Sequence, residues 1–340
     1  STRPVIVVYD ELYLAHLRNA RHPESPDRVA HVAAHLASTG QFGERRDARD
    51  ASDDELLFVH TLAYLERVKR DVAAVDARGG YLSTGDTAID DMSLAVARRA
   101  AGGALAALEY AVAGGCAAFA LIRPPGHHAE PERGMGFCIF DNAAIAAHAF
   151  VKRHGGRALI LDFDYHHGNG TQAAARDGVS FVSTHAYPAY PGTGSAGENV
   201  FRPDATVVNV PLTPHGFGTE PFVAVWQRLV REAADLVKPD LIVVSAGYDY
   251  ATGDPIGDLG VEGPLAASLL AVAIREAAET YSGGRVVYCL EGGYDLDVLA
   301  ASVAATLRAH DAAAGGARAE PASIPLPQRA ILERVGAWRS

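Results

Sequence analysis

The sequence has few of the features that mark several common classes of protein. It has only three cysteines in 340 residues, and none of them lies in a CxxC spacing. Each one is in an apolar or glycine-rich stretch, which predicts buried free thiols rather than a redox or cysteine–metal motif. The three are Cys116, Cys138 and Cys289.

Long apolar runs and basic clusters are missing as well. The opening stretch STRPVIVVYD has only a four-residue apolar run before charge appears, which is unlike a signal peptide or a membrane-contacting segment. We therefore expect a cytoplasmic location by default. There are 30 basic residues against 41 acidic ones, a formal charge of −11, and no block of Lys or Arg stands out. This balance argues against a nucleic-acid partner.

Apolar residues make up 49% of the chain, which is ample for a large core. Short, often β-branched apolar runs recur with flanking glycines, as in strands that are buried on both faces of a parallel sheet. They cover 5–9, 117–122, 157–164, 179–184, 205–210, 240–247 and 285–293. Helical patterns fill several gaps, such as 92–113, 142–153, 220–237 and 264–281. The alternation predicts an α/β fold with one mostly parallel, doubly wound sheet.

The chain shows no internal repeat and no Ser/Gly linker, so we expect a single catalytic domain over 1–310. The stretch AAAGGARAEPASIPLPQRA near its end is looser and contains proline. It predicts a C-terminal extension, 311–340, that packs on the same domain.

Polar motifs follow four of the predicted strands. RPPGHHAE follows the first of these strands, DFDYHHGNG ends the second, SAGYDY ends the third and EGGYD ends the fourth. In open α/β sheets, ligands bind outside the carboxyl ends of the strands. We therefore expect these four segments to converge on one edge of the sheet.

The stretch LDFDYHHGNG (161–170) contains the residues with the strongest metal-binding pattern. Strand alternation places Asp162, Asp164 and His166 on one side and His167 on the other. Asp164 and His166 form a D-x-H pair that could chelate one ion, and Asp249 in SAGYDY is the natural third ligand. Two carboxylates and one imidazole leave an open position, as in a catalytic zinc site, although Fe²⁺ or Co²⁺ also fits such ligands.

Two adjacent histidines and one tyrosine could complete a hydrolytic site. His127 and His128 lie in a loop stiffened by Pro and Gly, and an imidazole suits general acid/base work on an activated water. Each needs an orienting partner on its far nitrogen, and Asp162 and Asn169 are available. Tyr294 follows two glycines at a strand end, where its hydroxyl could stabilise a developing oxyanion.

At this point the motifs resemble a known family. PPGHHA, GFCIFDN, DFDYHHGNGTQ, SAGYD and EGGY, in this order, are similar to those of the histone deacetylase superfamily, which includes bacterial histone deacetylase-like amidohydrolases and acetylpolyamine amidohydrolases. The resemblance spans about residues 20 to 295. It implies an arginase-like α/β fold and a zinc-dependent deacetylase, with an acetylpolyamine or N-ε-acetyl-lysine as substrate.

The resemblance also implies a role for each motif residue. His128, backed by Asn169, would be the general base and then the general acid, while His127, paired with Asp162, would supply electrostatic stabilisation. Tyr294 would polarise the acetyl carbonyl. The zinc ligands would be Asp164, His166 and Asp249, and the tunnel residues would be Gly136, Phe137 and Tyr190. A monovalent cation, K⁺ or Na⁺, would be held near Asp162, Asp164, His166, Ser183 and Thr184. Arg28 would line an inner channel for acetate.

Some features bear on the choice of substrate. Asn169 is typical of the class II and bacterial amidohydrolase branch. The segment from Tyr9 to Arg28 is short and lacks the insertion with which some acetylpolyamine amidohydrolases dimerise and narrow the site. Its absence weakens a strict polyamine assignment. The sequence leaves open whether the protein forms a homo-oligomer. A cationic substrate could meet the rim carboxylates of STGDTAIDD, although a helix start explains at least two of them. These three are Asp86, Asp90 and Asp91.

Two other functions are compatible with part of the sequence. A dinuclear Mn²⁺ ureohydrolase of the arginase or agmatinase type needs further carboxylates, and SAGYDYATGDP supplies only Asp249 and then Asp254. A non-catalytic protein that binds acetylated molecules would not need every metal-ligating residue and Tyr294, yet all of these residues are present. The sequence therefore favours the deacetylase.

Overall fold

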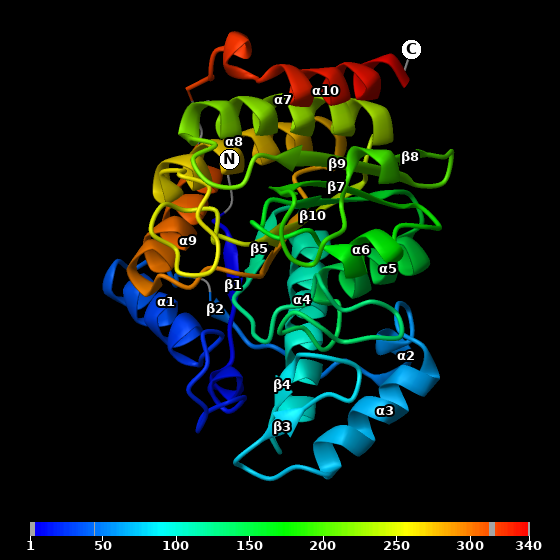
Figure 1. Ribbon diagram of the computed structural model, residues 1–340, viewed down its shortest axis with the longest axis vertical. Coiled ribbons are helices and arrows are strands. Elements are labelled where there is room, and N and C mark those ends of the chain that lie inside the picture. The colour runs from blue at the N-terminus through cyan, green and yellow to red at the C-terminus, as the bar shows by residue number, and fades with distance from the viewer. Residues whose placement is uncertain (1–3, 44, 313–316, 339–340) are drawn as a thin grey trace.

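A large sheet runs through the part of the chain that the computed structural model describes, residues 4–43, 45–312 and 317–338 (Figure 1). Within those ranges its strands follow the order β2-β1-β5-β11-β10-β6-β7-β9-β8, and all neighbours are parallel except β8 and β9. The strands are β1 (Ile6–Val8), β2 (Arg45–Arg46), β5 (Ala117–Ala120), β6 (Ala158–Asp162), β7 (Val179–Ala186), β8 (Val200–Phe201), β9 (Thr206–Leu212), β10 (Leu241–Ala246) and β11 (Val286–Leu290). The predicted α/β class with a mostly parallel sheet is confirmed.

Each of the seven predicted apolar runs overlaps one strand of this sheet, and β7 and β9 continue two residues beyond the predicted runs. The central strands β5, β6, β10 and β11 are buried along their whole length, because helices cover both faces. Strands β2 and β8, which were not predicted, are two-residue pairings at the two edges of the sheet.

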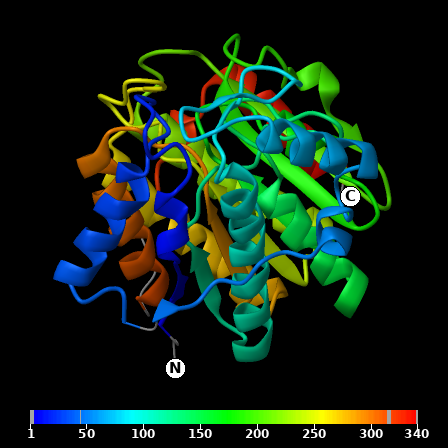
Figure 2. The same ribbon diagram turned by 90° about the horizontal axis from the view of Figure 1, so that it is seen from below.

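Helices cover the sheet in two layers. Helices α4 (Ser93–Gly114) and α5 (Asn142–His154) pack on one face, and α7 (Thr219–Val237) and α8 (Gly263–Tyr281) pack on the other. Helix α9 (Leu296–Asp311) packs on α8, and α1 (Asp27–Ser38) packs on α9, as both views show (Figures 1 and 2). All four predicted helical patterns are present.

Smaller elements complete the fold. In the described ranges they are α2 (Asp53–Leu56), α3 (Leu62–Ala73), α6 (Asn169–Ala173), the hairpin β3 (Gly80–Tyr81) and β4 (Ala88–Ile89), and the short 3₁₀ helices Glu11–Leu14, Ala196–Glu198 and Pro321–Ser323. Helix α3 packs on α4. Among the described residues, every helix is too short or too polar to cross a lipid bilayer.

The predicted extension, 311–340, is described in part, and residues 313–316 and 339–340 lie outside the described residues. Helix α10 (Leu326–Trp338) lies along α7 and contacts β9 (Figure 1). Its Leu332 and Val335 side chains are fully buried, and Gln328 donates a hydrogen bond to the carbonyl of Pro211. The described part of the extension therefore contributes to the same core.

Candidate active site

Four neighbouring strands carry the four polar motifs. Strands β5, β11, β10 and β6 lie side by side in the centre of the sheet, and all run in the same direction. Their carboxyl ends therefore meet at one edge, and RPPGHHAE, EGGYD, SAGYDY and DFDYHHGNG all begin there. This topology brings segments more than 100 residues apart in sequence into one site.

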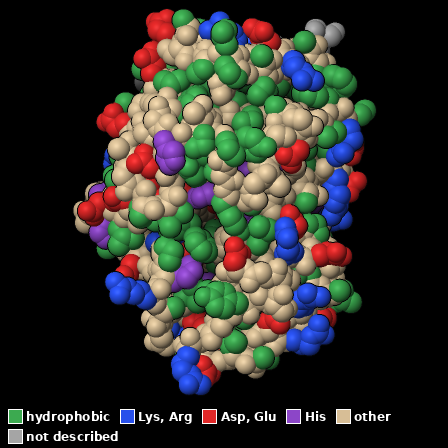
Figure 3. All heavy atoms as spheres, in the orientation of Figure 1, with side chains coloured by type: hydrophobic (Ala, Val, Ile, Leu, Met, Phe, Trp, Pro, Cys, Tyr) green, Lys and Arg blue, Asp and Glu red, His purple; other side chains and the backbone are tan. Residues whose placement is uncertain are grey.

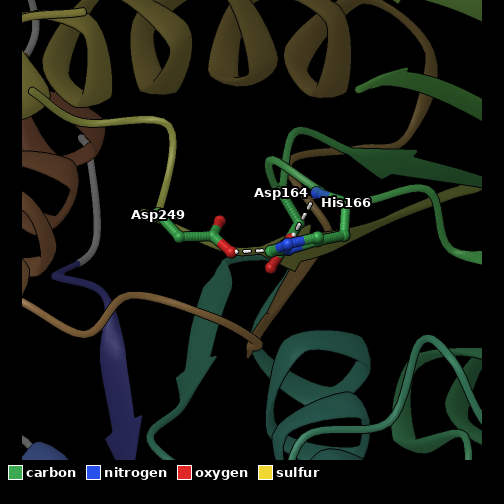
Figure 4. Close-up of side chains that lie close together, drawn as sticks. All are labelled: Asp164, His166 and Asp249. Carbon is green, nitrogen blue, oxygen red and sulfur yellow. Dashed lines mark hydrogen bonds and ion pairs between the residues drawn. The ribbon is translucent and has the colours of Figure 1, made fainter. Parts of the chain in front are cut away.

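Asp164, His166 and Asp249 form a compact cluster at this edge. One ligand atom from each lies within 4.8 Å of the others. The His166 Nδ1 atom is 3.0 Å from Asp249 Oδ2 and 3.3 Å from Asp164 Oδ1, and the three side chains point toward one another (Figure 4). Among the described residues, this is the group of carboxylates and imidazoles placed to hold one metal ion.

Backbone amides fix the two carboxylates of the cluster. Strand β6 ends at Asp162, two residues earlier than the apolar run predicted, and the chain then turns. His166 N donates to Asp164 Oδ1 at 2.8 Å, and Gly292 N donates to Asp164 Oδ2 at 2.9 Å. Tyr165 N donates to Asp249 Oδ1 at 2.9 Å. Despite the early strand end, His166 faces the cluster and His167 faces away, as alternation predicted.

The charge balance of the cluster fits a divalent cation. Burial would lower the pKa of His166, but its hydrogen bonds to the Asp164 and Asp249 carboxylates raise that pKa to about 10. Burial and the Asp164 charge raise the pKa of Asp249 to about 7. Two buried carboxylates thus compete for one positive charge, and a divalent cation would satisfy both.

Two glycines leave the space that this cluster needs. A Cβ atom on Gly247 would lie 1.9 Å from Asp164 Oδ2. A Cβ atom on Gly292 would lie 2.7 Å from the Oδ2 atoms of both Asp164 and Asp249. Any side chain at either position would push a carboxylate out of the cluster.

His127 is held as a charged group. Its Nδ1 atom is 2.8 Å from Asp162 Oδ2, and both side chains are buried. Burial alone would lower the pKa of His127, but nearby carboxylates, Asp162 first among them, raise it well above its ordinary value. The arrangement favours an imidazolium at neutral pH.

His128 is held as a neutral group. Its Nδ1 atom lies 2.8 Å from Asn169 Oδ1. Burial, together with the positive charges of His127 and His166, lowers the pKa of His128 well below its ordinary value. A carbonyl acceptor at Nδ1 selects the tautomer with the proton on that atom, which leaves the Nε2 lone pair open.

A cavity of about 380 Å³ opens onto both histidines and onto Asp164 and His166 of the cluster. Its lining includes three of the predicted residues, Gly136, Phe137 and Tyr190, and also Tyr294. The Phe137 and Tyr294 rings meet edge to face with centroids 6.0 Å apart, and burial raises the pKa of Tyr294 well above its ordinary value, which keeps the hydroxyl a donor. Figure 3 shows a hollow on this face, with histidine and hydrophobic side chains at its edge.

The acidic rim residues divide into two kinds. Asp86 lines the cavity and accepts hydrogen bonds from Tyr190 Oη at 2.9 Å and Gly136 N at 2.9 Å. Asp90 is buried and accepts from the Leu17 and Met92 amides, and Asp91 pairs with Arg18. Only Asp86 of the three is therefore placed to meet a substrate in the cavity.

Other predicted residues lie around the site. Ser183 and Thr184 are in β7, and Ser183 pairs in register with Asp162 of β6. His167 contacts Thr193 Oγ1 at 2.7 Å, outside the metal cluster. Arg28 is fully buried and donates from Nε to the Gly293 carbonyl and from Nη2 to the Glu291 carbonyl, so it braces the EGGY turn.

Three supporting carboxylates were missed from the sequence. Glu291 Oε2 accepts from the amides of Gly126 and His127, which ties the histidine loop to the end of β11. Asp254 accepts from the amide of Tyr294 at 2.8 Å. Glu130 Oε1 accepts from Asn169 Nδ2 at 2.8 Å. Glu291 and Glu130 belong to the quoted motifs EGGY and RPPGHHAE, but their partners depend on how the turns fold.

Comparisons with known proteins agree with this geometry. The family model described as the histone deacetylase domain matches residues 22–310. A histone deacetylase-like amidohydrolase of Pseudomonas aeruginosa is 41% identical over 285 residues, which cover 81% of this chain and 73% of that protein. A probable deacetylase of Archaeoglobus fulgidus is 36% identical over 299 residues, with 86% and 81% covered.

A solved structure shows the same fold. The crystal structure of the HDA15 HD domain superposes with a TM-score of 0.86 at 32% identity, and the match covers 100% of this chain and 95% of that one. The chain therefore has the same α/β fold as that domain.

Proposed function

The chain belongs to the histone deacetylase family, and we propose that it removes acetyl groups from acetylated amines by metal-dependent hydrolysis. Its relatives are named as deacetylases and amidohydrolases, so it is a hydrolase that acts on amide bonds. The observation that carries the proposal is the cavity that joins the Asp164–His166–Asp249 cluster to His128 and Tyr294.

Asp164, His166 and Asp249 would hold one divalent cation, and Zn²⁺ suits this ligand set, with Fe²⁺ or Co²⁺ as alternatives. Such an ion supplies Lewis acidity toward a water molecule and the acetyl carbonyl. The remaining chemistry comes from the side chains of this chain.

His128 acts as the general base and then as the general acid. Its neutral form and open Nε2 atom allow it to take a proton from the attacking water. It returns that proton to the amine nitrogen as the C–N bond breaks. The products are then the neutral amine and acetic acid, and the remaining acid proton passes to the amine to give an ammonium ion and acetate. The His127 imidazolium, paired with Asp162, offsets the negative charge that develops in the site.

Tyr294 donates a hydrogen bond to the carbonyl oxygen as it becomes an oxyanion. Its neighbours hold the ring: the guanidinium of Arg28 lies 4.8 Å from the ring centroid, and Asp254 accepts from the Tyr294 amide. A preorganised donor at this place stabilises the transition state more than the ground state.

The monovalent cation belongs to the same proposal. K⁺ or Na⁺ would be held beside the metal cluster by oxygens of Asp162, Ser183 and Thr184, and the register pair of Asp162 with Ser183 supports this placement. It would help to balance the buried carboxylates behind the site.

The substrate is an acetylated amine with a slender chain. The aromatic rings of Phe137 and Tyr190 line the cavity and suit the methylene chain of acetyl-lysine or of an acetylpolyamine. Asp86 at the same cavity is the one rim carboxylate available to a distal ammonium group. We place the reaction in a cytoplasmic setting, which agrees with three buried cysteines that are not joined in disulfides.

The arginase-type alternative receives no support from the geometry. Asp254, the additional carboxylate in SAGYDYATGDP, accepts hydrogen bonds from the amides of Tyr294, Ile256 and Gly257. Among the described residues, the metal-binding group contains Asp164, His166 and Asp249 without it. A second metal ion would lack a carboxylate ligand here.

Substrate rates test the proposed function. Purified protein supplied with Zn²⁺ is compared on acetylputrescine, acetylspermidine and an acetyl-lysine peptide, with and without a chelator. We expect hydrolysis of at least one of these that the chelator abolishes. Hydrolysis that is insensitive to the chelator, or none on any of the three, would overturn the proposal.

A further inference from the structure

The Asn169 side chain joins His128 to a carboxylate that the mechanism does not use. Asn169 Oδ1 lies 2.8 Å from His128 Nδ1, and Asn169 Nδ2 lies 2.8 Å from Glu130 Oε1. We propose that Glu130 is a positioning residue which, through Asn169, holds His128 in the tautomer with an open Nε2 atom. This inference rests on the proposed function of His128 as the general base.

The two ends of the Asn169 amide offer different groups to His128. The amide can lie in either of two orientations, which exchange its oxygen and its nitrogen. In the observed orientation the oxygen accepts the Nδ1 proton of His128. In the reversed one the NH₂ group would face Nδ1, which would move the ring proton to Nε2 and remove the lone pair that takes a proton from water.

Glu130 decides between these two orientations. A carboxylate only accepts hydrogen bonds, so it selects the orientation that presents the Asn169 NH₂ group to it. Reversal would place the amide oxygen beside the carboxylate, which replaces a charge-assisted hydrogen bond by repulsion. The other partners of Asn169 Nδ2, the His128 carbonyl and Met135 Sδ, are both at 3.4 Å and bind more weakly.

The same contact explains why an amide at position 169 suits this chain. An aspartate in place of Asn169 would set a second carboxylate against Glu130 at the distance of a hydrogen bond. Because an aspartate accepts with either oxygen, it would also need no orienting partner toward His128. Glu130 is therefore required with asparagine at this position and harmful with aspartate.

A double-mutant cycle on kcat/KM measures whether the effect of Glu130 changes sign with the residue at position 169. Glu130→Ala is expected to lower kcat/KM by about 10- to 100-fold, the usual effect of losing an orienting partner. In the Asn169→Asp background, the same substitution is expected to leave kcat/KM unchanged or raise it. Glu130→Gln keeps an acceptor oxygen and is expected to retain most of the activity. Glu132→Ala, an exposed carboxylate in the same loop, is the matched control and should have no effect.

A second measurement reads the tautomer directly. In ¹⁵N-histidine-labelled protein, the imidazole shifts of His128 should report a proton on Nδ1 in the wild type and in Glu132→Ala. Glu130→Ala should show the other tautomer or a mixture, while its thermal unfolding stays that of a folded protein. Equal losses from Glu130→Ala in both backgrounds, or a wild-type tautomer in Glu130→Ala, would overturn the inference. If the wild type hydrolyses no acetylated amine, the proposed function fails, and the NMR result still decides the role of Glu130.

Discussion

Two adjacent imidazoles are held in different protonation states because their Nδ1 partners differ in charge. His127 faces the Asp162 carboxylate and is held as an imidazolium, whereas His128 faces the Asn169 carbonyl and is held neutral. The ring centroids are only 4.1 Å apart, so the charge on His127 itself helps to keep His128 neutral. In the proposed reaction, His127 would stabilise negative charge while His128 would move the proton.

The pH profile of kcat/KM follows from this difference. Activity needs neutral His128, whose pKa is lowered from 6.5, so the profile should stay flat down to pH 6.5 and fall only at lower pH. Asn169→Asp places a carboxylate at Nδ1, which favours the imidazolium. The pH below which kcat/KM decreases should therefore rise by about one unit or more. An acid limb that stays in place in this variant would contradict the assignment of His128 as the base.

Removal of the tyrosine hydroxyl tests the oxyanion donor. Tyr294→Phe keeps the ring against Phe137 and Arg28 but loses the hydrogen bond, so kcat should fall by about 10²–10³-fold. The bound-metal content should stay that of the wild type, because Tyr294 is outside the metal cluster. Near-wild-type turnover would remove Tyr294 from the mechanism.

At the scale of elements, the site depends on sharp turns directly after the strands. Strand β6 stops at Asp162, and glycines after β10 and β11 let the chain pass close to the carboxylates. The backbone amides released by these turns then fix the ligands, as Gly292 N does for Asp164. The turn backbones therefore help to set the positions of the three side chains that would hold a metal ion.

Gly247→Ala tests the role of these turns. The added methyl would overlap Asp164 Oδ2, so the cluster should bind Zn²⁺ about 10- to 100-fold more weakly, as measured by chelator competition. Gly197→Ala is the control, since a Cβ there meets nothing closer than 3.5 Å. Unchanged affinity in Gly247→Ala would show that the turn tolerates a side chain and that the close approach is not required.

The central strands and the clustering of the three candidate ligands could be predicted because each leaves a local pattern. A strand buried on both faces needs a continuous apolar run, and a ligand at its carboxyl end is a polar residue that follows that run, as Asp249 follows β10. The edge strands β2 and β8 leave no such run, because partial exposure removes the need for it. Glu291, Asp254 and Glu130 were missed since each acts on an amide brought near only by the folded turns.

At the scale of the whole molecule, the core continues from the sheet into the C-terminal extension. Helix α10 buries Leu332 and Val335 against the layer that contains α7. Since these side chains belong to the same apolar cluster as the central strands, we expect the extension to unfold together with the rest of the domain.

Leu332→Ala tests this coupling. Loss of a fully buried leucine should lower the free energy of unfolding by about 2–5 kcal/mol and shift the single main transition to lower temperature. Glu333→Ala, an exposed neighbour on the same helix, should leave the transition in place. If the main transition is unchanged in Leu332→Ala, the extension folds independently of the domain.

The central claim is that one divalent cation, held by Asp164, His166 and Asp249, makes this chain a deacetylase. Its most direct test is to strip the protein of metal and titrate Zn²⁺ back while following hydrolysis of the best acetylated substrate. The account predicts no activity in the stripped protein and full recovery at about one ion per chain. Asp249→Asn should show little recovery, whereas Asp297→Asn, a surface carboxylate, should recover fully. Full activity without metal, or a need for two ions per chain, would contradict it.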